Sequence, residues 1–136
     1  MRNVLSISLL LLLLASCDDH RLGEVLTTAD SLLVEDADSA LRYLEANGLH
    51  NITAEAKGTH GAKATYRYQG RWQSIDHILV TPVLLDAVEQ TYVNDAPFLL
   101  EEDKKYGGVK PLRTFNGYRY QRGFSDHLPL VVRFNL

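Results

Sequence analysis

The chain has 136 residues and a formal net charge of −3, from 17 acidic and 14 basic side chains. This balance excludes an overall basic field, so any nucleic-acid binding must come from a local cluster of Lys and Arg. The only cysteine is Cys17, which excludes an internal disulfide and a zinc site built from several thiolates. The length is sufficient for one small domain with a modest core.

Residues 1–16 have the pattern of a bacterial lipoprotein signal peptide. A short basic head precedes an apolar run at residues 4–14, which is too short to cross a bilayer as a permanent helix. The run ends in Leu-Ala-Ser-Cys, which resembles a lipobox, where the cysteine is acylated and becomes the new N-terminus after cleavage. We therefore expect lipidation of Cys17 and a protein anchored in a bacterial cell envelope, at the outer membrane or the cell surface.

Residues 17–50 are expected to form a lipid-anchored helical hairpin. Apolar side chains recur at three- and four-residue steps between residues 22 and 33, as on one face of a helix. A second helix is expected at residues 39–46, capped by Asp38 and ended by Gly48 in the left-handed conformation. A single helical pair is interpreted as a packing element or stalk, because a functional repeat array needs several copies.

Residues 51–136 are expected to form the main domain, which begins with strands at residues 64–69 and 72–80 joined by a Gly-Arg turn. Within the second strand, Asp76 would share a face with apolar side chains. A carboxylate in that position needs a partner, since burying it unpaired costs several kcal/mol or more. We expect this partner to be an imidazole from another strand.

The segment that follows divides into a connection and an aromatic hairpin. Residues 81–111 are expected to be mostly a long connection, with a helical turn at residues 82–88. Residues 113–124 are strand-like and interleave aromatic with basic side chains, namely Phe115, Tyr118, Tyr120 and Phe124 with Arg113, Arg119 and Arg122. Such a mixture can stack on bases or hold phosphate, but an ordinary hairpin surface has the same composition, and both interpretations are open.

A Ser-Asp-His triplet at residues 125–127 stands directly before an apolar run of β-forming residues at 128–132. This order is typical of a loop that leads into a buried strand. The carboxylate can bind a hard cation, and the imidazole can transfer a proton near neutral pH. Three polar residues in a turn are also common by chance, so the triplet alone does not identify a site.

Several of these stretches, taken together, resemble a known enzyme family. Residues 70–80 (GRWQSIDHILV) and 124–129 (FSDHLP), with the intervening stretches 95–108 and 113–118, are similar to the C-terminal part of the endonuclease/exonuclease/phosphatase family. The resemblance covers roughly residues 60–136, and it rests on the agreement of several motifs in order and spacing.

The resemblance implies a fold, an activity and three site residues. The family has a deoxyribonuclease-I-like sandwich of two β-sheets flanked by helices, and it hydrolyses phosphoester bonds with a divalent metal, usually Mg²⁺. His127 matches the histidine that contacts the scissile phosphate and takes part in proton transfer, and Asp76 matches the carboxylate that pairs with it. Asp126 matches the neighbouring aspartate, which helps to hold the metal or the phosphate-bound site. We therefore expect an α+β fold in which part of this sandwich, with mainly antiparallel strands, follows the helical hairpin.

The first half of the family pattern is not found in this sequence. That half supplies an asparagine, a metal-binding glutamate and a Gly-Asp-x-Asn strand end, whereas this chain has no Gly-Asp-x-Asn and residues 18–50 read as helices. We therefore expect a truncated, lipid-anchored member of the family with little hydrolytic activity of its own. Its expected partners are the membrane, a phosphoester substrate (nucleic acid, phospholipid head groups and sugar phosphates are all open), and a missing N-terminal half-domain or a second copy of itself.

A second interpretation of the sequence is not enzymatic. In this interpretation the chain is an envelope lipoprotein that binds a partner through its aromatic and basic hairpin. The position of Asp76 relative to His127 discriminates between the two, because only the inherited hydrolase site requires these side chains to be within hydrogen-bonding reach.

Overall fold

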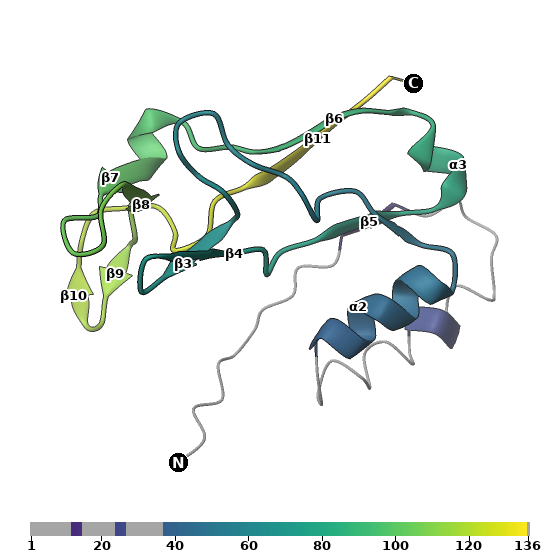
Figure 1. Cartoon of the computed structure of the whole chain (residues 1–136), viewed down its shortest axis with the longest axis horizontal. Helices are drawn as coiled ribbons and strands as arrows, with labels where there is room; N and C mark the ends of the chain where they lie inside the picture. The colour runs from purple at the N-terminus through teal and green to yellow at the C-terminus, as the bar shows by residue number, and fades with distance from the viewer. Residues whose placement is uncertain (1–11, 15–23, 27–36, 136) are drawn as a thin grey trace, which may run out of the picture.

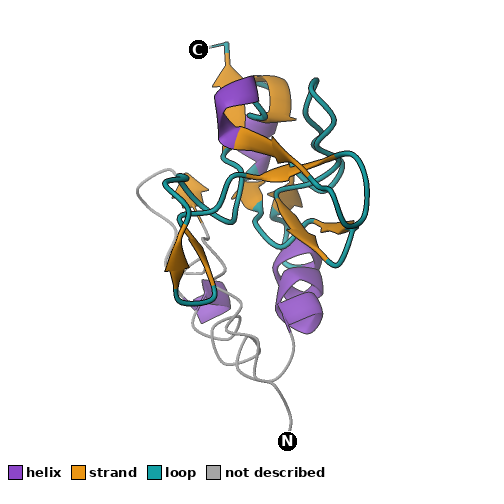
Figure 2. Cartoon of the chain, turned by 90° about the vertical axis from the view of Figure 1, so that its left-hand side faces the viewer, coloured by secondary structure: helices purple, strands orange, loops and turns teal. Residues whose placement is uncertain are grey.

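The computed structural model describes residues 12–14, 24–26 and 37–135 (Figure 1). Strands and loops make up most of these residues, and helices are few (Figure 2). Apart from β1 with β5, the strand pairs are antiparallel. The architecture is therefore α+β, as expected from the sequence. A helical hairpin is not established, because most of its first helix lies outside the described residues.

The strands are short, and they follow one another as β1 (Leu12–Leu14), β2 (His50–Asn51), β3 (Tyr66–Tyr68), β4 (Arg71–Gln73), β5 (Ile78–Val80), β6 (Val88–Val93), β7 (Leu100–Glu102), β8 (Val109–Pro111), β9 (Phe115–Asn116), β10 (Arg119–Tyr120) and β11 (Leu130–Phe134). Helical segments are α2 (Ala37–Ala46), α3 (Pro82–Leu85), a 3-10 turn at Pro97–Leu99 and a helical turn at residues 24–26. No helix within these ranges is long and apolar enough to cross a membrane.

β5 is the central strand of a three-stranded sheet with the order β1-β5-β2. β1 runs parallel to β5, and β2 runs antiparallel to it. Leu79 and Val80 of β5 have no exposed surface, as expected for a strand with neighbours on both edges. β1 lies within residues 1–16, the segment expected to be a signal peptide, and cleavage of that segment stays a prediction.

A first core cluster joins α2 to this sheet. Leu44 of α2 is fully buried, because the apolar face of the helix points toward β5. The cluster consists of Val25, Leu44, Leu49 and Leu79, with Leu26, Leu41 and Tyr43 packed around it. It holds α2 and the helical turn at residues 24–26 against one side of the sheet.

The ends of α2 are close to the expected positions. Gly48 has a φ of 89°, and the Leu49 N–H donates to the Leu44 carbonyl at 3.2 Å, so the helix ends at the glycine as expected. At its start, α2 already includes Ala37. Asp38 therefore lies in the first turn, where its charge favours the helix dipole, and does not cap the helix.

The prediction of one long strand at residues 72–80 is wrong. The structure has two short strands, β4 and β5, separated by irregular backbone at residues 74–77. The strand is interrupted because β4 pairs with β3, whereas β5 pairs with β1 and β2. Asp76 lies in the connection between the two sheets, so it does not share a strand face with apolar neighbours.

Residues 81–111 contain more regular structure than the connection expected there. The helical turn is present as α3, but β6 then pairs along its length with β11 near the C-terminus. β7 and β8 form an antiparallel hairpin. The prediction failed at β6 because its sequence, Val-Glu-Gln-Thr-Tyr-Val, becomes a strand through its distant partner, and local propensity only weakly indicates this.

The hairpins β3–β4, β7–β8 and β9–β10 gather at one end of the molecule (Figure 1). A second core cluster lies where the β3–β4 and β7–β8 hairpins meet β6 and β11, and it consists of Ala56, Ala62, Val93 and Leu128, with Trp72, Leu99, Leu100 and Leu130 packed around it. Leu128 is the residue after the triplet at 125–127. Its burial therefore anchors the loop that carries His127.

Candidate functional site

Asp76 and His127 meet although they are far apart in the sequence. Asp76 Oδ2 lies 2.7 Å from His127 Nδ1, which is hydrogen-bonding distance. The two side chains are 17% and 28% exposed, respectively, so their contact is sheltered from bulk water without being sealed from it. The expected contact is therefore present, but the irregular loops 74–77 and 125–127 supply it, not two strand faces.

Backbone contacts with β3 hold His127 in place. His127 forms an isolated antiparallel bridge with Tyr66, and the Leu128 N–H donates to the Thr65 carbonyl at 2.8 Å. The His127 N–H donates to Ser125 Oγ at 3.0 Å, which closes the turn. The Tyr66 ring centroid also lies 5.0 Å from that of the imidazole. The ring orientation is therefore set by a carboxylate, an aromatic ring and the backbone together.

The pair has the arrangement of an orienting carboxylate and a proton-transferring imidazole. When Nδ1–H is donated to Asp76, the neutral ring retains Nε2 as an acceptor. Asp76 also stabilises the imidazolium that forms when Nε2 takes up a proton. The pair can therefore remove a proton from an oxygen atom near Nε2, or return one to it.

Asp126 does not join this pair. Its side chain is exposed, and it lines a separate pocket of about 250 Å³ together with Arg113 and Phe124. Among the residues that the structure describes, no group of three or more His, Cys, Asp or Glu side chains could hold a metal ion. The Mg²⁺ that the resemblance implies and a metal-binding role of Asp126 therefore both stay predictions.

A polar network beside the pair was missed by the sequence analysis. The Asn51 amide donates to His77 Nδ1 at 3.1 Å, and the Asn51 Oδ1 accepts from the N–H and hydroxyl of Thr53 at 3.1 and 3.3 Å. The Thr53 hydroxyl in turn accepts the Ile78 N–H at 2.8 Å. This network ties the loop that carries Asp76 to the segment that follows β2.

Burial lowers the pKa of His77, although nearby carboxylates, first among them Asp76, act to raise it. His77 therefore favours its neutral form, in which Nδ1 can accept the proton of the Asn51 amide. No local pattern marks this network, because Asn51 and His77 are brought together by the pairing of β2 with β5. His77 thus helps to hold the loop that carries Asp76 in place. Its role differs from that of His127, whose Nδ1 contacts a carboxylate.

A buried carboxylate, Asp95, organises a loop next to the second core cluster. Asp95 is 2% exposed and accepts the N–H groups of Thr59, His60 and Ala62 at 2.8, 2.6 and 3.1 Å. Burial acts to raise the pKa of Asp95, but these hydrogen bonds outweigh it, so the pKa lies below its usual value of 3.8. Asp95 is therefore committed to the backbone and is not available to a ligand.

The aromatic and basic segment at residues 113–124 forms the β9–β10 hairpin and its flanks. Tyr118 is completely exposed, and Phe115, Tyr120 and Phe124 are exposed by more than half. The rings of Phe115 and Tyr120 lie 5.5 Å apart across the hairpin. These rings are accessible to a partner. The interpretation of the hairpin as a partner-binding surface stays a prediction.

Comparison with known proteins places the chain in one family. The model of the Endonuclease/Exonuclease/phosphatase family matches residues 24–135. The match begins well before the segment that carried the resemblance, so it also includes α2 and β2. No curated protein and no solved structure matches the chain. Because the family match spans most of the sequence and contains both Asp76 and His127, the chain belongs to the endonuclease/exonuclease/phosphatase family.

Proposed function

We propose that this protein is a lipid-anchored phosphoesterase-family protein that binds a phosphoester group at the Asp76–His127 pair. The observation that supports this proposal is the 2.7 Å contact between the two side chains, which orients the imidazole. Membership of the family makes a phosphoester the expected ligand. The Cys17 lipid anchor is proposed from the Leu-Ala-Ser-Cys sequence alone.

The proposed chemistry uses the free nitrogen of His127. In phosphoester hydrolysis, water attacks phosphorus, the water loses a proton and the leaving oxygen gains one. His127 Nε2 can accept the first proton and deliver the second, while Asp76 stabilises the charged ring. The protonated ring also donates to a phosphate oxygen through a charge-assisted hydrogen bond. The pair therefore recognises phosphate whether or not the ester bond is broken.

Turnover in this family depends on a divalent metal, for which we propose Mg²⁺. Among the described residues, no three His, Cys, Asp or Glu side chains are grouped so that they could hold such an ion. Phosphoryl transfer depends on positioning and electrostatic stabilisation, so a site without metal ligands supplies only part of the required stabilisation. We therefore propose that this chain binds phosphate but, by itself, has little hydrolytic activity.

Full-length protein purified in detergent is expected to hydrolyse bis(p-nitrophenyl) phosphate in MgCl₂ no faster than buffer does. Added inorganic phosphate is nevertheless expected to shift the imidazole nitrogen resonances of His127, because Nε2 faces the bound anion while Asp76 holds Nδ1. An absorbance assay measures the first result, and NMR of the histidine side chains measures the second.

The matched control is His50→Ala, since His50 is exposed and lies outside the pair. Turnover that is lost in His127→Ala and kept in His50→Ala would contradict the proposed lack of hydrolysis. His127 resonances that do not move when phosphate is added would contradict phosphoester binding at the pair.

Cys17→Ser is expected to abolish acylation and to release the protein from membranes, because the serine hydroxyl is not a substrate for thiol acylation. Metabolic labelling with a fatty acid, followed by membrane fractionation, measures both effects in a bacterial host. Continued labelling of the variant would show that another residue is acylated, and would refute the proposed lipidation site.

A further inference from the structure

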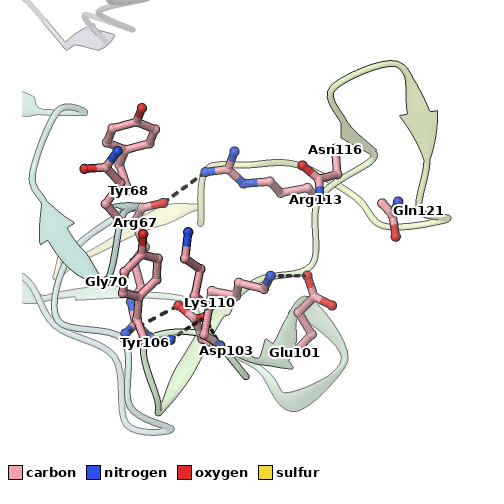
Figure 3. A pocket seen from close by; sticks show the side chains of 12 residues that line it. Arg67, Tyr68, Gly70, Glu101, Asp103, Tyr106, Lys110, Arg113, Asn116 and Gln121 are labelled. Carbon is pink, nitrogen blue, oxygen red and sulfur yellow. Dashed lines mark hydrogen bonds and ion pairs between the residues drawn. The ribbon is translucent and has the colours of Figure 1, made fainter.

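A pocket between the three hairpins carries an excess of positive charge. It has a volume of about 300 Å³ and is lined by β3–β4, by β7–β8 and by the segment that runs through β9–β10 (Figure 3). Its charged lining residues are Arg67, Lys105, Lys110, Arg113, Glu101 and Asp103. Four cations and two carboxylates leave a charge of about +2 in a chain whose net charge is −3.

Both carboxylates of this basic pocket are already committed. Asp103 is buried, accepts two backbone N–H groups of the turn that follows it at 3.1 and 3.2 Å, and lies 3.6 Å from Arg67. Burial acts to raise the pKa of Asp103, but the hydrogen bonds and nearby cations hold it below its usual value. Glu101 pairs with Lys110 at 3.4 Å (Figure 3). Arg67 and Lys110 are therefore matched within the pocket wall.

Lys105 and Arg113 have no carboxylate partner in the part of the chain that is described. Arg113 Nη2 donates to the Arg67 carbonyl at 2.9 Å (Figure 3). Its guanidinium carbon lies 5.4 Å from the centre of the Tyr66 ring. The Lys105 ammonium lies 5.0 Å from the centre of the Tyr106 ring. These contacts position the two cations but leave their charges unmatched.

Glycines bring the walls of the basic pocket together. A Cβ on Gly70 would lie 2.7 Å from Tyr106 Cβ, so only glycine lets the β3–β4 turn approach the β7–β8 turn this closely. Gly107 and Gly108 have φ values of 75° and 74°, and Arg67 donates to the Gly107 carbonyl at 2.7 Å. The pocket is therefore preformed by backbone contacts, which lowers the entropic cost of binding.

We propose that the basic pocket binds the phosphate group of a ligand, with Lys105 and Arg113 as its counter-ions. A phosphate monoester carries a charge of about −1.5 to −2 at neutral pH, which complements the charge of the pocket. Arginine presents a planar set of donors to phosphate oxygens, and lysine supplies a point charge. The amides of Asn116 and Gln121 line the same pocket and offer further donors (Figure 3). Because the Asp76–His127 pair does not line it, this inference does not rest on the proposed function.

Calorimetric titration of the full-length protein in detergent with glycerol 3-phosphate, at low salt, tests the proposal. Lys105→Gln is expected to weaken binding about tenfold, because it removes a charge-assisted contact. Lys104→Gln is the matched control, since Lys104 is the exposed neighbour that does not line the pocket. Arg113→Gln is expected to have at least the effect of Lys105→Gln; if loss of its carbonyl contact unfolds that variant, Lys105→Gln still decides the result.

Two further arms separate the alternatives. Binding that is kept in His127→Ala and weakened in Lys105→Gln supports the proposal for the basic pocket. Binding that is weakened in His127→Ala and kept in Lys105→Gln overturns that proposal and leaves the proposed function intact. Equal affinities of the wild type, Lys104→Gln and Lys105→Gln also overturn it.

Dihexanoyl phosphatidic acid, as a monomer, carries the same phosphate on a lipid. Tighter binding of this probe, lost in Lys105→Gln, assigns the pocket to a lipid head group, and equal binding assigns it to a soluble phosphate.

Discussion

Asp95→Ala is expected to lower the free energy of unfolding by about 3 kcal/mol or more, because three backbone donors lose a charged acceptor in a buried site. Asp95 is 2% exposed, so water does not readily replace the lost hydrogen bonds. The carboxylate also fills the space beside Gly58, where a Cβ would lie 2.1 Å from Asp95 Cγ. The substitution therefore leaves both unsatisfied N–H groups and a void next to the second core cluster.

Urea unfolding followed by far-ultraviolet circular dichroism measures this loss. Asp86→Ala is the matched control, since Asp86 is exposed at the end of α3 and the same atoms are removed. The loss of unfolding free energy in Asp95→Asn is expected to fall between those of the two alanine variants, because its amide oxygen still accepts from the loop but carries no charge. A loss for Asp95→Ala no greater than that for Asp86→Ala would show that the carboxylate does not hold the loop.

The same carboxylate predicts how stability changes with pH. The folded-state pKa of Asp95 is lower than its usual value of 3.8, so near that pH the unfolded chain binds more protons than the folded one. The stabilisation that Asp95 contributes is therefore fully present well above pH 3.8, and it is lost as the pH falls through the folded-state pKa of Asp95. Asp95→Asn should unfold with a shallower dependence in this acid range, and Asp103, whose pKa is also lowered, should supply part of the remaining slope.

Gly123→Ala is expected to destabilise the fold by about 3 kcal/mol and to detach the loop that carries His127, because the added methyl group meets backbone that cannot move aside. A Cβ there would lie 2.1 Å from the Leu112 carbonyl oxygen and 2.3 Å from that of Arg113. The Phe124 N–H also donates to the Leu112 carbonyl at 2.9 Å. Relief of the clash therefore breaks the contact that places residues 125–127.

Gly117→Ala is the control for this substitution. Gly117 has a φ of 59°, so alanine there is strained by about 1 kcal/mol, but nothing lies within 4 Å of the added Cβ. Thermal unfolding compares the two variants, and NMR of the His127 ring reports its contact with Asp76. Equal melting temperatures, with an unchanged His127 ring in Gly123→Ala, would contradict the steric argument.

Local signals in the sequence were sufficient for several elements. The second helix and its end at Gly48 were predictable, because apolar periodicity and a left-handed glycine act within a few residues. The hairpin within residues 113–124 and the strand after His127 were predictable for similar reasons. The strand bounds were less accurate, since β11 extends to Phe134 and the strand expected at residues 72–80 is interrupted.

The Asp76–His127 contact was predicted through a partly wrong argument. The premise that Asp76 lies on an apolar strand face failed, because residues 74–77 form a connection between two sheets. The partner was nevertheless correct, because the family resemblance identified the histidine and a sheltered carboxylate requires a hydrogen-bond donor. The motif thus indicated which residues meet, but not which backbone brings them together.

The sequence alone predicted a small, mainly antiparallel α+β chain of a phosphoesterase family, with Asp76 and His127 as a pair. Only the tertiary structure decided that β6 pairs with β11, that Asp95 is bound by the backbone, and that unmatched cations gather between three hairpins. The physical reason is that helix ends and turns depend on neighbouring residues. A strand partner, a buried acceptor or the local charge of a pocket depends on segments that meet only when the chain folds.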